Sequence, residues 1–385
     1  MKKIIRASTI PLSLNIFCRD TLREMSKLYD VVALSSSGDL LDEVEQREGV
    51  RAIRVDMERR ISPIKDLVSL FKIIKVFRKE KPYIVHSMTP KAGLLCMMAA
   101  WLTRVPLRIH TFTGLVFPST TGIKRQILMF TDRITCLCAT HVIPEGEGVK
   151  NDLQDNHITK KPMQVLGYGN VRGVDMNYYS RRPNVMDFAN KLRDESLTTF
   201  LFVGRIGKDK GLEELCKAFD LLWKERKDIR LWIVGMDDSQ ADPITLDTRN
   251  LMENHERIEA VGMKRDTELL AYYAAADCFV LPSYREGFPN TVLEAGAFDL
   301  PSIVTDINGS REIIIEGENG IIIPTHDTNA LYKAMRAMVD NPQQRKAMAS
   351  KARDLVSTRF EQGYVRQCLF DFYDKIIRES ESSKK

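Results

Sequence analysis

The feature that most constrains this chain is a regular alternation of short β-branched segments with helical segments. In the first half, six such segments predict strands, at residues 3–7, 31–35, 52–55, 83–87, 107–111 and 141–144. Helical patterns lie between them, as at 63–78 and 91–102. Parallel strands need crossover connections of this kind, so the pattern predicts a parallel, doubly wound sheet.

The same alternation restarts after a glycine-rich segment, 167–175, that has no hydrophobic periodicity. Six more strands are predicted beyond it, at 200–203, 230–234, 258–261, 278–282, 302–305 and 320–323. Helices such as 212–224 and 291–298 separate them, and the chain after Asp327 is helical. We therefore predict two Rossmann-like domains that face each other across a cleft, with ligands at the carboxyl ends of the strands.

Charge divides unevenly along the 385 residues, although the net charge is only +5. Residues 1–170 contain 26 Lys and Arg against 17 Asp and Glu, and residues 171–385 contain 31 against 35. A basic first half indicates a surface for something anionic, with a nucleic acid, a membrane surface or a phosphorylated substrate as the candidates. The alternative is that its basic residues are scattered and solvated.

Several function classes lose support from the sequence. Seven cysteines without a Cys-x-x-Cys pair indicate neither a disulfide framework nor a zinc site, and are typical of reduced thiols in a cytosol. The longest charge-free apolar stretch, 92–103, is shorter than the roughly 20 residues of a membrane-spanning helix. Neither half has Gly-x-Gly-x-x-Gly after its first strand, and the chain lacks a P-loop, which argues against dinucleotide redox chemistry and phosphate-loop hydrolysis.

The turn after residues 200–203 is rich in glycine and basic residues. Residues 204–211 read GRIGKDKG and lead into a predicted helix. A diphosphate would meet a guanidinium, an ammonium and free backbone amides in such a turn. A merely solvated basic turn explains the same residues equally well.

A second group of polar residues follows 278–282, where residues 283–296 read SYREGFPNTVLEAG. The amides near Asn290 lie at the positive end of a predicted helix and can bind an anion. Glu294 lies inside that helix, where its carboxylate could accept hydrogen bonds from a ribose diol, and Glu286 can reach another part of the same ligand. Taken singly, both glutamates could be solvated surface residues. Because the two glutamates lie eight residues apart around the start of a helix, they favour a ligand-binding site.

Glu286 and Glu294 match the Glu-x7-Glu motif, and on this motif the chain resembles the retaining glycosyltransferases of family 4, which have the GT-B fold. The resemblance extends over nearly the whole chain, to 203–205 with 210–211, 85–87 with 90–93, and 308–312 with 317–320. Within the family the chain is most similar to the bacterial capsule, O-antigen and lipid-linked oligosaccharide branch.

The resemblance implies an α/β, GT-B architecture of two doubly wound domains with C-terminal helices. Residues 1–170 would form the acceptor-side domain, 171–182 a linker, and 183–360 the nucleotide-sugar-binding domain. A last helix, 361–385, can cross back to the N-terminal domain.

The resemblance also implies a role for each matching residue. Arg205 and Lys210 would bind the donor diphosphate and stabilise its charge as it leaves, and Glu286 would contact the donor sugar, which makes these three the predicted catalytic residues. Glu294 would bind the ribose. The other predicted donor-binding residues are Gly204, Gly287, Phe288, Pro289, Asn290 and Thr291. We expect no metal and no cofactor, since the basic groups and helix amides supply the positive charge.

One position departs from the family pattern. Many relatives carry a histidine after the fifth strand of the first domain, whereas residues 110–114 here read HTFTG and Thr113 aligns with that histidine. We expect Thr113, Gly114 and Lys91 on the acceptor or donor-sugar side of the site. We interpret His86 and His110 as structural histidines.

The segment from Arg59 to Lys81 holds eight basic and two acidic residues, with apolar residues at helical spacing. Such a helix can pack on the sheet and can also dock on an anionic membrane without inserting.

The resemblance implies a retaining glycosyltransferase that moves a hexose or an N-acetylhexosamine from a nucleotide sugar, with UDP as the expected nucleotide. The expected acceptor is a lipid-diphosphate-linked saccharide of bacterial surface polysaccharide biosynthesis. We expect a cytoplasmic protein, peripheral at the inner face of the bacterial cytoplasmic membrane, with an anionic membrane surface as partner and no nucleic acid. The alternatives are a GT-B sugar epimerase and a nonenzymatic nucleotide-sugar-binding protein.

Overall fold

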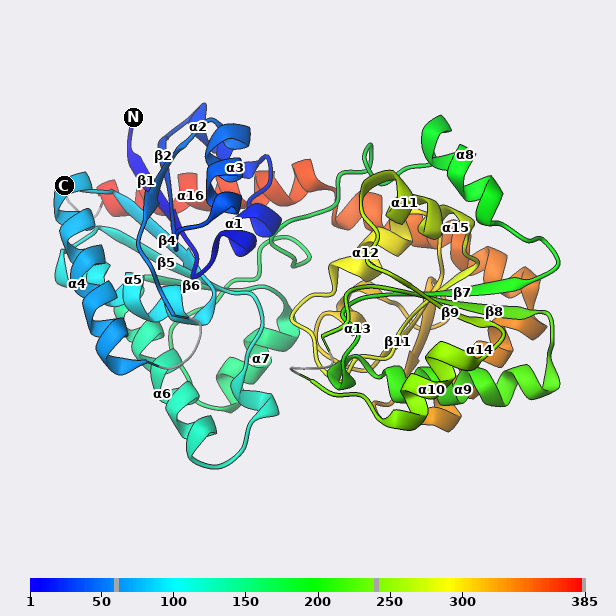
Figure 1. Cartoon of the computed structure of the whole chain (residues 1–385). Coiled ribbons are helices and arrows are strands. Elements are labelled where there is room, and N and C mark those ends of the chain that lie inside the picture. Colours follow the sequence, from blue (N-terminus) through cyan, green and yellow to red (C-terminus); the bar gives the residue numbers. More distant parts are fainter. Residues whose placement is uncertain (59–61, 239–241, 383–385) are drawn as a thin grey trace. The chain divides into compact units, whose positions relative to one another are not determined.

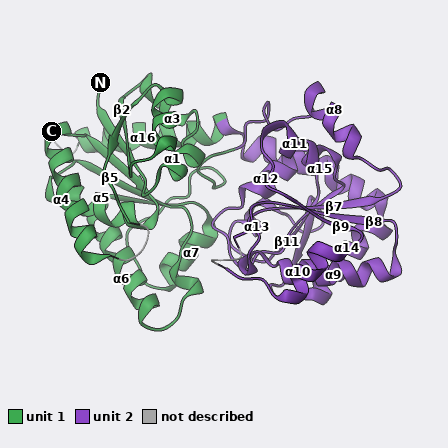
Figure 2. Cartoon of the chain, viewed as in Figure 1, with its two compact units in different colours: residues 1–173, 363–385 green, residues 174–362 purple. Residues whose placement is uncertain are grey.

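The computed structural model describes residues 1–58, 62–238 and 242–382, and the chain is drawn from end to end in Figure 1. Its contacts divide into two compact units, coloured separately in Figure 2. Unit 1 comprises residues 1–173 and 363–385, and unit 2 comprises residues 174–362. The segment predicted as a linker, 171–182, is divided between the two units.

Unit 1 contains a six-stranded, parallel sheet in the order β3-β2-β1-β4-β5-β6. Its strands are β1 Lys3–Ala7, β2 Asp30–Ser35, β3 Arg51–Arg54, β4 Ile84–Met88, β5 Leu107–Phe112 and β6 His141–Pro144. The six strands predicted for the first half are therefore confirmed within one residue at each end. β-branched runs with helical segments between them were sufficient to locate the strands, because both faces of a parallel sheet are buried.

Helices cover both faces of this sheet. The helices of unit 1 are α1 Pro11–Phe17, α2 Thr21–Ser26, α3 Asp39–Glu48, α4 Pro63–Glu80, α5 Pro90–Leu102, the 3-10 turn η1 Phe117–Ser119, α6 Gly122–Cys138, α7 Glu147–Asp155 and α16 Gln362–Ser382. Alternate strand residues enter two separate cores, as Ile4 and Ile5 of β1 do. One core contains the buried sides of α4, α5 and α6, and the other contains those of α1, α2, α3 and α16.

The last helix, α16, packs on unit 1 although it follows unit 2 in the sequence (Figure 2). Its Tyr373 is fully buried, and the hydroxyl accepts a hydrogen bond from Arg6 of β1 (3.0 Å) and lies 2.6 Å from Nδ1 of His86. Near the surface, the Tyr29 hydroxyl donates to Asp374 (2.9 Å). A buried polar cluster therefore fixes this helix to the sheet.

Unit 2 contains a second six-stranded, parallel sheet, in the order β12-β11-β10-β7-β8-β9. Its strands are β7 Thr198–Val203, β8 Ile229–Val234, β9 Ile258–Gly262, β10 Cys278–Leu281, β11 Ser302–Thr305 and β12 Gly320–Ile323. Its helices are α8 Pro183–Leu192, the 3-10 turn η2 Lys208–Lys210, α9 Leu212–Glu225, α10 Leu246–Asn254, α11 Asp266–Ala275, α12 Asn290–Ala297, α13 Ser310–Ile313, α14 Thr328–Asp340 and α15 Pro342–Arg359. The six predicted strands are confirmed within two residues, and the prediction of two doubly wound α/β units is confirmed.

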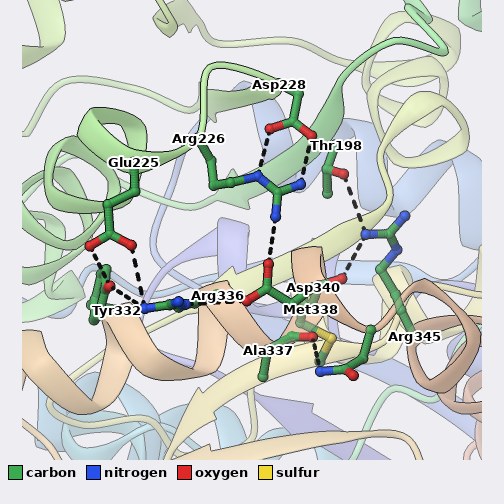
Figure 3. Close-up of polar contacts among 11 residues, drawn as sticks. Thr198, Glu225, Arg226, Asp228, Tyr332, Arg336, Ala337, Met338, Asp340 and Arg345 are labelled. Atoms are coloured by element: carbon green, nitrogen blue, oxygen red, sulfur yellow. Dashed lines mark hydrogen bonds and ion pairs between the residues drawn. The ribbon is translucent and has the colours of Figure 1, made fainter.

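An exposed ion-pair network lies at the amino ends of the unit 2 strands (Figure 3). Arg226 pairs with Asp228, which precedes β8, and with Asp340 at the end of α14, at 2.8 and 2.5 Å. Arg336 also reaches Asp340 (3.2 Å). Exposed pairs of this kind contribute about 0 to 1 kcal/mol each. The network joins α9 and α14 and leaves the opposite, carboxyl edge of the sheet for ligands.

Among residues 1–58, 62–238 and 242–382, no helix has both the length and the apolar character needed to cross a bilayer. None of the seven cysteines forms a disulfide.

Asp132 of α6 gives a testable stability prediction. It is 8% exposed, and burial raises the pKa of its carboxyl to about 7. Because this folded-state pKa lies above the unfolded value, the free energy of unfolding should fall as pH rises from about 4 to about 7. Asp132→Asn should therefore stabilise the protein above pH 7, by at most about 4 kcal/mol, and have little effect near pH 4.

Thermal unfolding at pH 5 and pH 8 measures this difference, and Asp155→Asn, at an exposed position, is the control. An equal effect of Asp132→Asn at both pH values would contradict the prediction.

Candidate active site

The candidate site lies where the strand order of unit 2 reverses. β7 has β8 on one side and β10 on the other, so the connections from β7 and from β10 lead in opposite directions along the sheet. Loops that follow such neighbouring strands leave a crevice at the carboxyl edge, which is where open parallel sheets bind ligands. The two loops here are residues 204–211 and 282–289.

These two loops are in direct contact. Gly211 has φ +68°, and a Cβ at this position would lie 2.1 Å from the Pro282 carbonyl oxygen. The backbone amide of Tyr284 donates to the carbonyl of Asp209 (2.9 Å). Only glycine permits this approach, because a side chain would meet backbone that cannot move aside.

A third loop, which follows β11, packs against the second. Gly309 has φ +74°, and a Cβ there would lie 2.5 Å from the Gly287 carbonyl oxygen. Its amide donates to the carboxylate of Glu312 (3.2 Å), which closes the first turn of α13. The motif at 308–312 therefore supports the loop that carries Glu286.

The loop contact brings two predicted catalytic residues together. Lys210 Nζ donates to Oε1 of Glu286 at 2.5 Å, although 76 positions separate them in the sequence. Only 13% of the Lys210 side chain and 17% of the Glu286 side chain are exposed. The alternative that Glu286 is a solvated loop charge is therefore wrong.

Arg205 lies in the same loop and is paired with carboxylates that the sequence analysis did not single out. Its guanidinium forms ion pairs with Asp209 (3.2 Å) and with Asp238, which follows β8. Arg285 also approaches Asp209 (3.5 Å), and burial raises the pKa of the Asp209 carboxyl. If an anion binds here, the Arg205 guanidinium would exchange these carboxylates for oxygens of the anion. Asp209 was visible within the turn, whereas Asp238 becomes a neighbour only through the pairing of β7 with β8.

The described residues contain no group of three His, Cys, Asp or Glu side chains placed to hold a metal ion.

Helix α12 begins beside the Lys210–Glu286 pair. Its N-cap residue is Pro289, whose side chain makes no capping hydrogen bond, and its first turn starts with Asn290 and Thr291. The first turn of a helix carries backbone amides at the positive end of the helix dipole. The side chain of Phe288, another predicted donor-binding residue, is buried and packs against Phe360, with ring centroids 5.5 Å apart.

Glu294 is buried in α12, so the alternative of an exposed helix residue is wrong. Its Oε1 accepts a hydrogen bond from the Tyr179 hydroxyl (2.8 Å), and its Oε2 accepts one from the Tyr273 hydroxyl (3.1 Å). The two phenols therefore orient the carboxylate from two different segments of the chain. Neither tyrosine is near Glu294 in the chain, so sequence reasoning did not identify them.

Tyr284 anchors the second loop to the neighbouring helix. Its hydroxyl donates to Glu214 of α9 (2.7 Å), and its ring lies 3.7 Å from that of His326. Burial and this hydrogen bond raise the pKa of the Tyr284 hydroxyl. The residue therefore holds the loop and stays protonated at neutral pH.

The residues predicted for the acceptor side lie in unit 1. Thr113 and Gly114 follow β5, and Lys91 in the first turn of α5 forms an ion pair with Asp66 of α4. A cavity of about 440 Å³ opens nearby between the ends of β2 and β3 and α4, but none of the three predicted residues lines it.

The two histidines of the central strands are structural, as predicted. His86 Nε2 bonds Thr111 (2.7 Å) and His110 Nδ1 bonds Ser87 (2.9 Å). Burial lowers the pKa of His110 to about 3 and that of His86 well below its usual value, so both are neutral.

Comparison with known proteins adds family evidence. A family model described as "Glycosyl transferases group 1" matches residues 186–355, and one described as "Glycosyl transferase 4-like domain" matches residues 14–169. The chain is 30% identical over 363 residues to the capsular polysaccharide biosynthesis glycosyltransferase CapM of Staphylococcus aureus, covering 92% of each protein. It is 29% identical over 354 residues to an Escherichia coli UDP-Gal:alpha-D-GlcNAc-diphosphoundecaprenol alpha-1,3-galactosyltransferase, covering 88% of each.

Two solved structures show the same fold. Anabaena HepE in complex with UDP superimposes with a TM-score of 0.81 at 15% identity, covering 97% of this chain and 100% of that one. A glycosyltransferase from Rickettsia africae superimposes with a TM-score of 0.80 at 20% identity, covering 98% of both chains.

The Glu294 cluster predicts a stability effect. Tyr179→Phe and Tyr273→Phe each remove a donor from a buried carboxylate, and each should lower the free energy of unfolding by about 1.5 to 3 kcal/mol. Tyr332→Phe is the matched control, because its hydroxyl bonds Glu225 at the surface (2.7 Å, Figure 3) and should cost less than about 1 kcal/mol. Urea unfolding followed by circular dichroism compares the three. Equal effects would show that Glu294 does not depend on the two phenols.

Proposed function

Because the chain belongs to the family 4 glycosyltransferases, as its motifs predicted, we propose that it transfers a hexose or an N-acetylhexosamine from a UDP-sugar to a lipid-diphosphate-linked saccharide. The product would be part of a capsular or related surface polysaccharide. The observation that carries the proposal is the grouping of Arg205, Lys210 and Glu286 beside the amino end of α12.

The donor diphosphate would lie between the loop 204–211 and α12. Arg205 can bind two phosphate oxygens, Lys210 adds a point charge, and the amides near Asn290 and Thr291 supply further donors. Gly204, Gly287 and Pro289 would contribute backbone of the two loops to this position. Glu294, oriented by its two tyrosines, would bind the ribose. UDP is favoured because the Escherichia coli relative is named for UDP-Gal.

Sugar transfer would depend on charge that develops in the leaving diphosphate. In the free protein Arg205 and Lys210 are paired with Asp209, Asp238 and Glu286. When the diphosphate binds, Lys210 would shift from Glu286 to phosphate, which frees the Glu286 carboxylate to face the sugar. Positive groups that are fixed before reaction stabilise the leaving group without further reorganisation.

We propose that the configuration at the anomeric carbon is retained. The departing phosphate oxygen would accept the proton of the acceptor hydroxyl on the same face of the sugar, so the protein needs no separate base. No metal or other cofactor is part of this proposal, since Arg205, Lys210 and the helix amides would supply the positive charge that the diphosphate needs.

The acceptor would be held on unit 1, near Thr113, Gly114 and Lys91. The Escherichia coli relative is named for an acceptor on diphosphoundecaprenol, which is a membrane lipid. The basic first half of the chain suits such a surface, and we propose peripheral attachment at the inner face of the cytoplasmic membrane.

The direct test is incubation with a panel of UDP-sugars and a saccharide linked to undecaprenyl diphosphate, followed by detection of the extended lipid and of free UDP. Transfer from one donor, with the product linkage in the donor's anomeric configuration, supports the proposal. A sugar epimerase would alter the UDP-sugar without an acceptor, and a nonenzymatic binding protein would release no UDP.

The first kinetic prediction concerns the diphosphate. Arg205→Ala and Lys210→Ala should each cost about 2 to 4 kcal/mol of transition-state stabilisation, which is a roughly 30- to 1000-fold loss of rate. Lys208→Ala, exposed in the same turn, is the matched control and should retain most of the activity. Assays in EDTA should give the same result. Near-normal rates for both variants, or loss of activity in EDTA with recovery on adding Mg²⁺, would contradict the assignment.

The second kinetic prediction separates the two glutamates. Glu294→Gln should mainly raise KM, because a ribose contact is alike in the ground and transition states. Glu286→Gln should mainly lower kcat, because the sugar gains positive charge during transfer. Glu318→Gln, an exposed change, serves as control. The opposite division between KM and kcat would exchange the two roles.

A further inference from the structure

Helix α6 of unit 1 has an apolar stripe on its solvent side. Ile123, Ile127, Phe130 and Leu137 recur at intervals of one helical turn, with the half-buried Ile134 between the last two. Ile123 is 81% exposed, Phe130 61% and Leu137 74%. The stripe spans about 21 Å along the helix axis. Large side chains in a contiguous exposed patch indicate an interaction surface.

Helix α4 adds a second exposed apolar group on the same side of the sheet. Ile64, Leu67, Val68 and Phe71 are all more than half exposed. α5 contacts both α4 and α6, and the buried sides of all three helices enter one core. The solvent sides of α4 and α6 therefore face outward from the same face of unit 1, as the arrangement of these helices in Figure 1 shows. We call these eight exposed residues of α4 and α6 the apolar face.

Basic side chains surround the apolar face. Lys72, Lys75, Arg78 and Lys79 of α4 form no ion pair within the described part of the chain. At the other side, Arg125 and Arg133 bind the side-chain and backbone oxygens of Asn156, and Lys161 donates to carbonyls at the carboxyl end of α6. These neutral partners leave the positive charges uncompensated. Arg59 and Arg60, which belong to the predicted basic segment, lie outside the described residues.

We propose that this face docks on an anionic lipid bilayer and inserts the α6 stripe into the interfacial region. Apolar side chains flanked by lysine and arginine are the combination that holds a helix in the plane of an anionic surface. This goes beyond docking without insertion, which the charges of 59–81 alone suggested.

Charge selects the bilayer over a second copy of this chain. The spacing of the α6 stripe would suit a helix–helix seam. In a symmetric pair, however, the basic residues around one apolar face would meet those of the other. An anionic lipid surface complements the same charges.

The position of the apolar face suits the proposed sugar transfer. The role that we assign to this face rests on that proposed function. In a parallel sheet each helix starts from the carboxyl edge, so the first turns of α4 and α6 lie at the edge that carries Lys91, Thr113 and Gly114. Ile64 and Ile123 belong to those first turns. Insertion of the stripe would bring the acceptor side of unit 1 to the depth of a lipid diphosphate.

A fluorescence experiment tests insertion directly. An environment-sensitive fluorophore is attached at Phe130→Cys in the full chain, in a Cys368→Ser background, because the other six cysteines are buried. Leu246→Cys, exposed on unit 2, is the matched control. Vesicles of phosphatidylglycerol and phosphatidylcholine should raise and blue-shift the emission at position 130 only, and pure phosphatidylcholine should do so much less. No change at position 130 with anionic vesicles would overturn the proposal.

Vesicle co-sedimentation compares matched sets of variants. Ile123→Gln/Phe130→Gln/Leu137→Gln should bind anionic vesicles at least about ten-fold more weakly, whereas Phe188→Gln/Leu221→Gln/Leu246→Gln on unit 2 should bind normally. Lys72→Glu/Lys75→Glu/Lys79→Glu should lose binding and its salt dependence, whereas Lys217→Glu/Lys333→Glu/Lys346→Glu should not. If only the lysine variant is affected, docking without insertion replaces the proposal. A dimer in solution that the α6 glutamine variant abolishes would assign the face to a second copy.

Stabilisation by UDP, measured as a shift in Tm, separates this inference from the proposed function. All variants should respond to UDP like the parent chain, because none of the changes lies in the donor site. Lost vesicle binding with a retained UDP response is the expected result for the α6 variant. If the chain binds vesicles but neither responds to UDP nor transfers sugar, the membrane-docking inference stands and the proposed glycosyltransferase function is refuted.

Discussion

The contact between the loops after β7 and β10 is the constraint on which the candidate site depends. The two strands are neighbours, and Gly211 lets the first loop pass within van der Waals distance of the Pro282 carbonyl. Without that approach Lys210 could not reach Glu286. The Gly309 contact with Gly287 then supports the second loop from its far side. The backbone geometry at Gly211 and Gly309 therefore decides where the charged side chains of the two loops lie.

The charges of the site are balanced before any ligand arrives. Arg205 and Lys210 each have carboxylate partners, and the Lys210–Glu286 pair is largely withdrawn from water. A buried pair of this kind gains little net stability, because desolvation offsets most of the attraction. In the proposed reaction, an anionic ligand would replace Glu286 as the partner of Lys210 and would release the Glu286 carboxylate.

The two units use their polar residues differently. In unit 1, His86, His110 and Lys91 are committed to internal partners, and the exposed chemistry lies on the outer sides of α4 and α6. In unit 2 the charged residues of the candidate site, Arg205, Lys210 and Glu286, lie in loops at the carboxyl edge of the sheet. This contrast follows the charge division of the sequence, in which the basic excess belongs to residues 1–170.

The sequence by itself determined the twelve strands, the two doubly wound units and the family, because periodicity and the Glu-x7-Glu spacing are local properties of the chain. It also located Arg205, Lys210, Glu286 and Glu294. Only the tertiary structure decided their partners, since Asp238, Tyr179 and Tyr273 approach through strand pairing and helix packing. It also decided that Phe288 is a core residue and that the α6 stripe faces solvent. A sequence shows which residues a helix carries, but the packing of its neighbours determines which of its faces remains uncovered.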